Sequence, residues 1–121
     1  AFFTAMFETA LARDEIVTAV HFPKADKAAY EKFPNPASRY SMAGVFVART
    51  GNGVRVGVTG AGPTAFRWID AENALAGNFS PAALDGLTLA ADRLNSDLHA
   101  SAEYRANLVK VMAKRAVAAA A

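Results

Sequence analysis

The sequence of 121 residues contains no cysteine, which excludes a disulfide framework and a metal site built on thiolates. It also lacks a strong excess of one charge, since 13 Lys and Arg stand against 11 Asp and Glu. The cations are scattered, which argues against a nucleic-acid-binding surface. No apolar run is long enough to span a bilayer, because charged residues or glycines interrupt each one. We therefore expect a cytoplasmic protein with no nucleic-acid partner and no membrane span.

The chain begins without methionine, and its opening AFFTAMFETAL lacks the cationic start and the small-residue cleavage site of a signal peptide. We interpret it as an excised domain, with more sequence upstream in the native protein. Its 53% hydrophobic and 20% charged residues are typical of a globular protein, and its length allows one hydrophobic core. The sequence therefore predicts a single domain over residues 1–121.

Local composition predicts strands in the first half of the chain and helices in the second. Runs rich in β-branched and aromatic residues, two of them joined by a GNG turn, predict strands over Glu15–Phe22, Ala29–Phe33, Met42–Arg49 and Val54–Val58. Helical spacing and helix-start signals predict helices over Trp68–Ala76, Pro81–Leu94 and Ser101–Ala118. This order favours the α+β class, an antiparallel sheet of about four strands with about three helices packed on one face.

The glycine-rich stretch VTGAGPTAFR, residues 58–67, raises the alternative of a dinucleotide-binding loop. Gly60 and Gly62 begin a GxGxxG pattern whose third glycine is replaced by alanine, a variant that such loops tolerate. However, Pro63 follows directly, and residues 66–68 separate the glycines from the expected helix, whereas a phosphate-binding loop must lead into a helix N-terminus. We therefore interpret this stretch as the end of a strand, where the backbone passes close to a neighbouring segment of the chain.

The titratable residues form no metal-ligand or catalytic pattern. His21 and His99 lie far apart and neither has a partner at ligand spacing, so surface positions are favoured over metal binding. Asp14-Glu15 precedes a predicted strand, where solvated carboxylates are favoured over an acid/base pair. Asp70 and Glu72 fall in an early turn of a predicted helix, where anions interact favourably with the helix dipole. The sequence therefore predicts no metal site and no catalytic residue.

Two stretches that contain cationic residues have both a structural and a functional interpretation. In YEKFPNPASRYSMAGV, Lys32 and Arg39 lie around a loop stiffened by prolines. In SAEYRANL, Arg105 lies in the first turns of the last predicted helix, where a cation is unfavourable for the helix dipole. A partner carboxylate or an interface would explain such an arginine, and an exposed side chain is the alternative. The residues themselves leave both interpretations open.

Five segments, taken together and in order, resemble a known family. They are FFTAMFETAL, DEIVTAVHFP, YEKFPNPASRYSMAGVFVA, VGVTGAGPTAFRWIDAENALAG and DLHASAEYRANLVKVMAKRAV, and they cover nearly the whole chain. The sequence is similar to the C-terminal domain of the FAD-binding medium subunit of molybdenum hydroxylases. That family includes aerobic carbon monoxide dehydrogenase and the xanthine dehydrogenases.

The resemblance implies a flavin-capping domain of a longer subunit, whose N-terminal FAD-binding domain holds most of the cofactor. In the family, electrons pass from a molybdopterin subunit through an iron–sulfur subunit to FAD and then to an acceptor, so these subunits are the implied partners. Val17 matches the aliphatic residue that packs on the flavin ring, and Lys32 matches the lysine near its reactive edge. A cation there would stabilise negative charge on the reduced flavin. The domain alone is expected to hold little or no FAD.

The loop after Lys32 departs from one branch of the family. In xanthine dehydrogenases this loop carries paired arginines and acids, whereas here it reads NPASRYSMAG, so the final electron acceptor stays open. Two alternatives to a flavin-capping part of an oxidoreductase also stay open. One is a scaffold domain that joins subunits without touching the flavin, and the other is a self-standing small α+β binding protein. We expect no enzymatic activity from the fragment alone.

Overall fold

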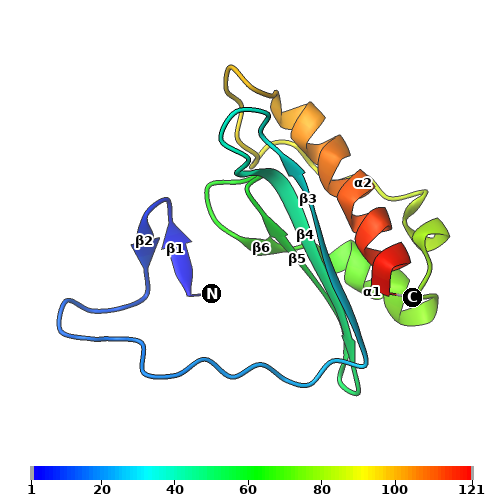
Figure 1. Cartoon of the computed structure of the whole chain (residues 1–121), viewed down its shortest axis with the longest axis horizontal. Helices are drawn as coiled ribbons and strands as arrows, with labels where there is room; N and C mark the ends of the chain where they lie inside the picture. The colour runs from blue at the N-terminus through cyan, green and yellow to red at the C-terminus, as the bar shows by residue number, and fades with distance from the viewer. Residues whose placement is uncertain (1, 121) are drawn as a thin grey trace.

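The computed structural model describes residues 2–120 and has two layers, a four-stranded antiparallel sheet and a layer of helices on one of its faces (Figure 1). The strands lie side by side in the order β3 (Lys27–Pro34), β4 (Ser41–Thr50), β5 (Gly53–Thr59) and β6 (Phe66–Arg67). The helices on the sheet are α1 (Ile69–Gly77) and α2 (Ala102–Ala120). The predicted α+β class is confirmed, although within the described residues the α-helices number two instead of about three.

Strands β4 and β5 form the centre of the sheet because they are apolar at alternate positions. Val45 and Val47 on β4, and Val56 and Val58 on β5, are fully buried beneath the helices. The GNG turn joins the two strands as predicted and leaves them in continuous antiparallel register. Burying a valine side chain contributes roughly 1.5–3 kcal/mol relative to leaving it exposed, so this row supplies much of the stability of the sheet.

Helix α2 packs across β3 and β4. Its buried residues recur at helical spacing on the face toward the sheet, and the larger ones are Leu108, Val109, Met112 and Val117. Ser101 caps the helix, because its Oγ accepts a hydrogen bond from the Tyr104 N–H at 3.2 Å. The cap and the apolar stripe together fix where α2 begins and which of its faces the sheet covers.

The predicted helix over Pro81–Leu94 is wrong beyond its first turn. Only the short 3₁₀ helix η1 (Pro81–Leu84) forms, and the chain then runs irregularly toward α2. Gly86 follows closely, and glycine within a helix costs about 1 kcal/mol relative to alanine. Leu87 and Leu89, only two residues apart, both pack against the core from this irregular segment. Leu84, Leu87 and Leu94, whose spacing predicted the helix, therefore pack in or against the core without forming one.

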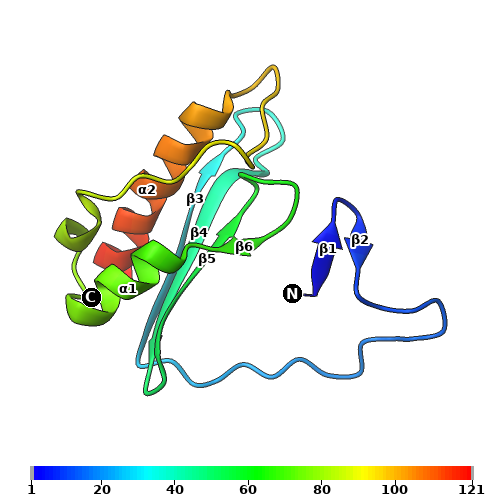
Figure 2. The same ribbon diagram turned by 180° about the vertical axis from the view of Figure 1, so that it is seen from behind.

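The predicted strand over Glu15–Phe22 is also wrong, because it pairs with no other strand within residues 2–120. It belongs to an arm, residues 10–26, that crosses irregularly from an N-terminal hairpin to β3 (Figures 1 and 2). The N-terminal hairpin consists of β1 (Phe3–Ala5) and β2 (Glu8–Thr9). Strand propensity describes a fit to a pleated sheet, and residues 2–120 offer this segment no neighbouring strand. The fourth strand of the sheet is instead β6.

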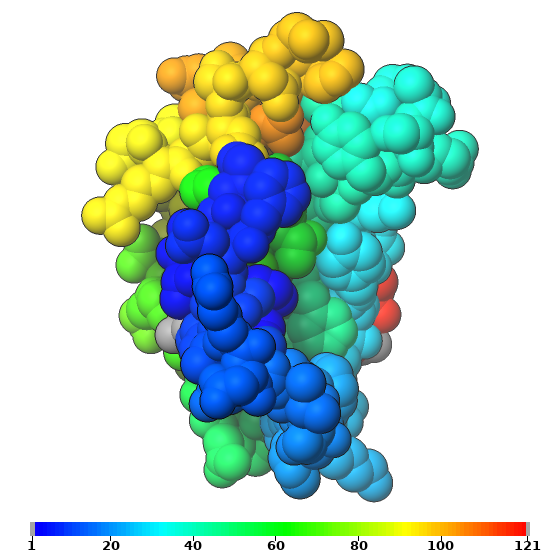
Figure 3. Space-filling view, turned by 90° about the vertical axis from the view of Figure 1, so that its left-hand side faces the viewer, coloured from blue at the N-terminus to red at the C-terminus, as the bar shows by residue number. Residues whose placement is uncertain are grey.

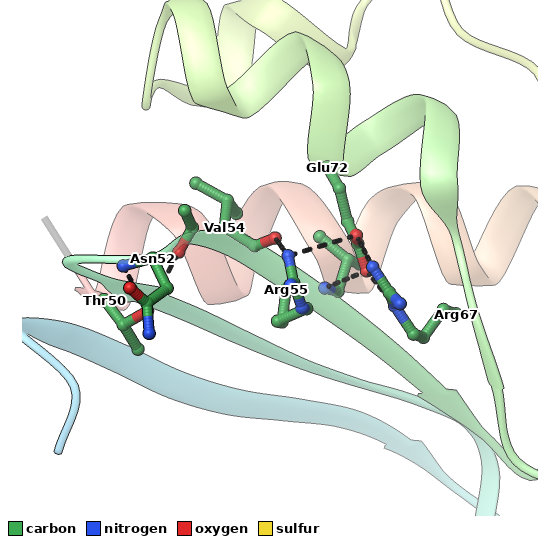
Figure 4. Close-up of polar contacts among 8 residues, drawn as sticks. Thr50, Asn52, Val54, Arg55, Arg67 and Glu72 are labelled. Carbon is green, nitrogen blue, oxygen red and sulfur yellow. Dashed lines mark hydrogen bonds and ion pairs between the residues drawn. The ribbon is translucent and has the colours of Figure 1, made fainter. Parts of the chain in front are cut away.

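Glu72 of α1 closes the edge of β5 beyond the end of the short strand β6 (Figure 4). Its buried Oε1 accepts the Val56 N–H at 3.1 Å and the Arg67 Nε–H at 2.8 Å. Arg67 donates a second hydrogen bond through Nη2 to Oε2, and Arg55 Nη1 lies 3.8 Å from the same oxygen. The carboxylate therefore satisfies a strand amide and at the same time pairs with two surface cations.

We expect Glu72→Gln to lower the free energy of unfolding by about 1 kcal/mol at neutral pH, because the amide cannot pair with both guanidinium groups. Burial opposes ionisation of Glu72, but hydrogen bonds from Arg67 and the Val56 N–H, with the guanidinium charges, lower its pKa below the ordinary value of 4.5. A carboxylate whose pKa is lowered by folding stabilises the fold above its unfolded pKa. That contribution is lost as the pH falls through the folded pKa.

Urea unfolding checks this expectation, with the fluorescence of Trp68, a buried residue and the single tryptophan, as the probe. The difference between wild type and Glu72→Gln should be largest near neutral pH and shrink progressively below about pH 4.5. Asp70→Asn is the control, because this exposed carboxylate lies in the same helical turn and its loss should change stability by under about 0.5 kcal/mol. A stability difference between wild type and Glu72→Gln that stays constant below about pH 4.5 would contradict this dependence of stability on the ionisation of Glu72.

Candidate functional site

The sheet face opposite the helices, called the open face below, carries no helix (Figures 1 and 2). Strand register assigns its side chains, because Tyr30 pairs with Phe46, Lys32 pairs with Gly44, and Gly44 pairs with Thr59. On β3, Tyr30 and Lys32 are exposed and alternate with partly buried residues, and on β4 the exposed Phe46 lies between the buried Val45 and Val47. The open face therefore combines two aromatic rings, a cation and a hydroxyl group on one rigid surface.

A cluster of hydroxyl groups lies on the open face above Gly44. The Tyr30 hydroxyl lies 3.4 Å from Ser41 Oγ and 3.4 Å from Thr59 Oγ1, and the three groups come from β3, β4 and β5. A Cβ on Gly44 would lie 2.3 Å from the Tyr30 hydroxyl, so the absence of a side chain makes the room that this cluster occupies. Sequence reasoning missed this cluster, and the only signal for it was a glycine inside a predicted strand.

Lys32 is exposed on the open face and is held by the loop that follows its own strand. Its Nζ donates a hydrogen bond to the Arg39 carbonyl oxygen at 3.1 Å. The buried Asn35 stiffens that loop, because its Oδ1 accepts the Ala37 N–H at 2.9 Å and the Ser38 N–H at 3.3 Å. The ammonium group is thus positioned by a carbonyl, and no carboxylate in the described part of the chain forms an ion pair with it.

Beside the open face, a groove of about 490 Å³ lies between the N-terminal hairpin and residues 59–65. Figure 3 shows the hairpin and the arm in front of the sheet on this side. Thr59 lines the groove and belongs to the open face, so the two surfaces are continuous. The glycine-rich stretch leads from β5 into β6, which confirms a strand end and makes the dinucleotide-loop interpretation wrong.

The structure places the two sequence-predicted cofactor residues on one side of the molecule. Lys32 projects from β3 onto the open face, and the half-exposed Val17 belongs to the arm, which lies on the same side of the sheet (Figures 1 and 2). Along residues 2–120 no three His, Asp or Glu side chains gather closely enough to hold a metal ion. No helix in this part of the chain has the length and apolar character needed to cross a membrane.

Arg105 has the partner carboxylate that its unfavourable helix position suggested. It is buried, its Nη2 donates to Asp97 Oδ2 at 2.8 Å, and its Nη1 donates to the Met42 and Gly60 carbonyls at 2.7 and 3.3 Å. The hydrogen bond from the His99 N–H lowers the pKa of Asp97 most. Burial opposes it, and the hydrogen bonds from Arg105 and the Ala100 N–H bring the pKa below its ordinary value. Arg105 therefore joins α2 to the sheet and has a structural role.

The described residues define a two-layer α+β domain with helices on one face of its sheet and the N-terminal hairpin and the arm on the side of the other (Figures 1 and 3). The chain belongs to the CO dehydrogenase flavoprotein C-terminal domain family, whose profile matches residues 28–120. The predicted resemblance to the C-terminal domain of FAD-binding medium subunits is thereby confirmed, and with it the flavoprotein and oxidoreductase class of its relatives.

Relatives of this chain are subunits of larger enzymes. It is 34% identical to the nicotine 6-hydroxylase medium subunit of Paenarthrobacter nicotinovorans, a match over 95% of this chain and 44% of that subunit. A reconstituted CO dehydrogenase from Oligotropha carboxidovorans superposes with a TM-score of 0.81 at 28% identity, over 98% of this chain and 46% of the other.

A second CO dehydrogenase, from Hydrogenophaga pseudoflava, lacks the Mo-pyranopterin moiety of its molybdenum cofactor. It superposes with a TM-score of 0.76 at 30% identity over the same shares, 98% of this chain and 46% of the other. The chain therefore spans less than half the length of each of these three relatives.

Proposed function

We propose that this domain covers the isoalloxazine ring of FAD in the medium subunit of a cytoplasmic molybdenum hydroxylase. An FAD-binding domain N-terminal to it in the same subunit holds the rest of the cofactor, so the fragment alone retains little or no FAD. The partners are an iron–sulfur subunit and a molybdopterin subunit, and the substrate is converted in the latter. The observation that carries the proposal is the Lys32 ammonium group on the open face, held by a backbone carbonyl and forming no ion pair with a carboxylate of residues 2–120.

The residues present on this side fit a flavin. An isoalloxazine ring is flat, apolar across its ring faces and polar along one edge, so it requires aliphatic or aromatic contact beside hydrogen-bonding groups. The arm offers Val17, and the open face offers Phe46 with the hydroxyl cluster nearby. FAD, when bound, supplies the electron-accepting chemistry that passes electrons on to an acceptor.

Lys32 has an electrostatic role in this proposal, and Val17 a packing role. A fixed cation next to a group that gains negative charge on reduction favours the reduced form, more strongly where water is excluded. The hydrogen bond from Nζ to the Arg39 carbonyl holds the charge in place before the cofactor is reduced, so little reorganisation is needed. Val17 excludes water from the ring face on which it packs.

Substitution in the full-length subunit tests the proposal. Lys32→Ala is expected to slow flavin reduction by about tenfold, because a charge contact at a partly desolvated site is worth about 1.4 kcal/mol or more. Val17→Ala is expected to lower the FAD content of the purified subunit by reducing apolar contact with the ring. Stopped-flow absorbance of the flavin measures the rate, and the ratio of flavin to protein absorbance measures the content.

Lys32→Arg and Lys27→Ala serve as matched controls. The first keeps the positive charge on the open face and should retain most of the rate, whereas the second removes an exposed lysine from the same strand, at its opposite end, and should change nothing. If Lys32→Ala and Val17→Ala both leave FAD content and reduction rate at wild-type values, the flavin-capping role fails. A scaffold that joins subunits without flavin contact would then be the remaining role.

A further inference from the structure

The arm carries an apolar surface that the described part of the chain leaves uncovered. Ile16 is 80% exposed, Val20 is 65% exposed and Phe22 is 86% exposed. Alternate residues of an extended chain share one face, so an extended arm places these three on one face and Val17 and His21 on the opposite one. Large apolar side chains gathered on one exposed surface mark an interaction site.

The backbone of the same segment is unpaired. The Glu15 N–H donates to the Ala12 carbonyl at 3.2 Å, and the Asp26 N–H donates to the Arg49 carbonyl at 2.8 Å. Between these two bonds, no backbone hydrogen bond is formed by residues 16–25 with any residue of the range 2–120. Strand-forming side chains on a backbone with free N–H and C=O groups suit addition to the edge of a sheet.

The relatives of this chain are longer than the chain itself, which favours a further domain of the same subunit as the source of the sheet edge. The family profile begins at residue 28, directly after the arm, whereas the matches to medium-subunit relatives extend over 95% and 98% of this chain. The arm is thus shared with the longer relatives but lies outside the C-terminal domain family. The chain covers only 44% and 46% of those relatives, so they have room for a further domain.

We propose that Glu15–Phe22 is a strand that joins a sheet edge of the FAD-binding domain of the same subunit, with Ile16, Val20 and Phe22 buried against that domain. The inference rests on the proposed function for the presence of that domain, but not for any contact with flavin. The opposite side of the strand then presents Val17 away from the buried row. Anchoring the arm in this way fixes Val17 relative to Lys32 across the two domains.

Hydrogen exchange in the full-length subunit tests this inference. Amides at alternate residues of 16–22 should exchange at least about 100-fold more slowly than in an unstructured peptide, because only one side of an edge-added strand donates to the sheet. The protection should persist after FAD is removed, since it depends on the neighbouring domain and not on the cofactor.

Substitutions on the two sides of the strand provide the matched comparison. Ile16→Ser and Phe22→Ser should each lower the protection of residues 16–22 by at least about tenfold, because each removes apolar burial that holds the strand in place. Ala19→Ser lies on the opposite side and should leave the protection unchanged. Equal effects from all three variants would overturn the assignment of the buried side.

Unprotected amides throughout residues 16–22 of the full-length subunit would overturn the inference. Protection that is lost on dilution, together with loss of a dimer in light scattering, would also overturn it in favour of pairing with a second copy. The two proposals fail separately. A protected arm, together with wild-type FAD content and flavin reduction in both Lys32→Ala and Val17→Ala, would overturn only the flavin-capping role. An arm that exchanges freely, together with slowed flavin reduction in Lys32→Ala, would overturn only the strand pairing.

Discussion

Gly60→Ala is expected to destabilise the domain by about 3 kcal/mol or more, at the upper end of single substitutions. Gly60 has a φ of +74°, a backbone conformation that residues with a side chain adopt only at a cost. A Cβ at this position would lie 2.1 Å from the Ser41 carbonyl oxygen and 3.0 Å from the Ser41 carbonyl carbon. These atoms are backbone at the start of β4, so the clash is relieved only by moving the strand.

The free energy of urea unfolding measures this cost, again with Trp68 fluorescence as the probe. Gly51→Ala is the matched control, because a Cβ there would meet nothing within 4 Å, and its effect should stay within about 1 kcal/mol. The comparison separates the clash and the strained φ at Gly60 from the general loss of backbone freedom in any glycine substitution. Similar losses for the two variants would show that the close approach to Ser41 is not what fixes glycine at position 60.

The glycine-rich stretch shows how far sequence reasoning reached. Its interpretation as a strand end was correct because local features opposed a phosphate loop, namely Pro63 and the separation from the next helix. The identity of the close neighbour was beyond reach, because Ser41 lies far away in the sequence and only the strand register brings it near. Local chemistry predicted the type of structure, and tertiary packing determined its partner.

The same distinction explains which elements were predicted well. The central strands were expected over Met42–Arg49 and Val54–Val58 and extend only slightly further, because alternation and a GNG turn are local signals. Helix α2 was also found, since it carries its own cap at Ser101. In contrast, Glu15–Phe22 and Pro81–Leu94 have the composition of a strand and a helix, but tertiary contacts determine their structure. Glu15–Phe22 pairs with no strand within residues 2–120, and leucines of the second segment pack against the core without a helix.

The candidate site was predictable only in part. Lys32 and Val17 came from a family resemblance, and no pattern of spacing would have joined residues from a strand and from the arm. The hydroxyl cluster of Tyr30, Ser41 and Thr59 was missed because its members meet through the register of three strands. A sequence presents such residues as unrelated positions, so a site on a sheet face becomes visible only when the register is known.

The sequence left two interpretations of Arg105 open, and its environment explains why an unfavourable helix position is tolerated. Its two Nη groups hold together α2, the start of β4 and the turn at Gly60, while Asp97 balances its charge. An arginine fork suits this task because it donates in several directions from one rigid plane. The same turn is therefore fixed twice, by the close packing of Gly60 against Ser41 and by the hydrogen bond from Arg105.

Arg105→Met is expected to lower the free energy of unfolding by about 2–4 kcal/mol, although methionine fills much of the same volume. The substitution leaves the Met42 carbonyl without its 2.7 Å donor in a buried site and removes the cation from beside Asp97. Arg105→Lys keeps the charge but replaces the planar fork with a single ammonium group, so an intermediate loss is expected.

Arg115→Ala supplies the control for this last prediction, because this exposed arginine lies on the same helix and its loss should cost under about 0.5 kcal/mol. Urea unfolding of the four proteins should rank their stabilities as wild type and Arg115→Ala, then Arg105→Lys, then Arg105→Met. Since Asp97 is 42% exposed, water can solvate it once the arginine is gone, so most of the loss must come from the carbonyls. A wild-type stability for Arg105→Met would show that α2 is held to the sheet by its apolar stripe alone.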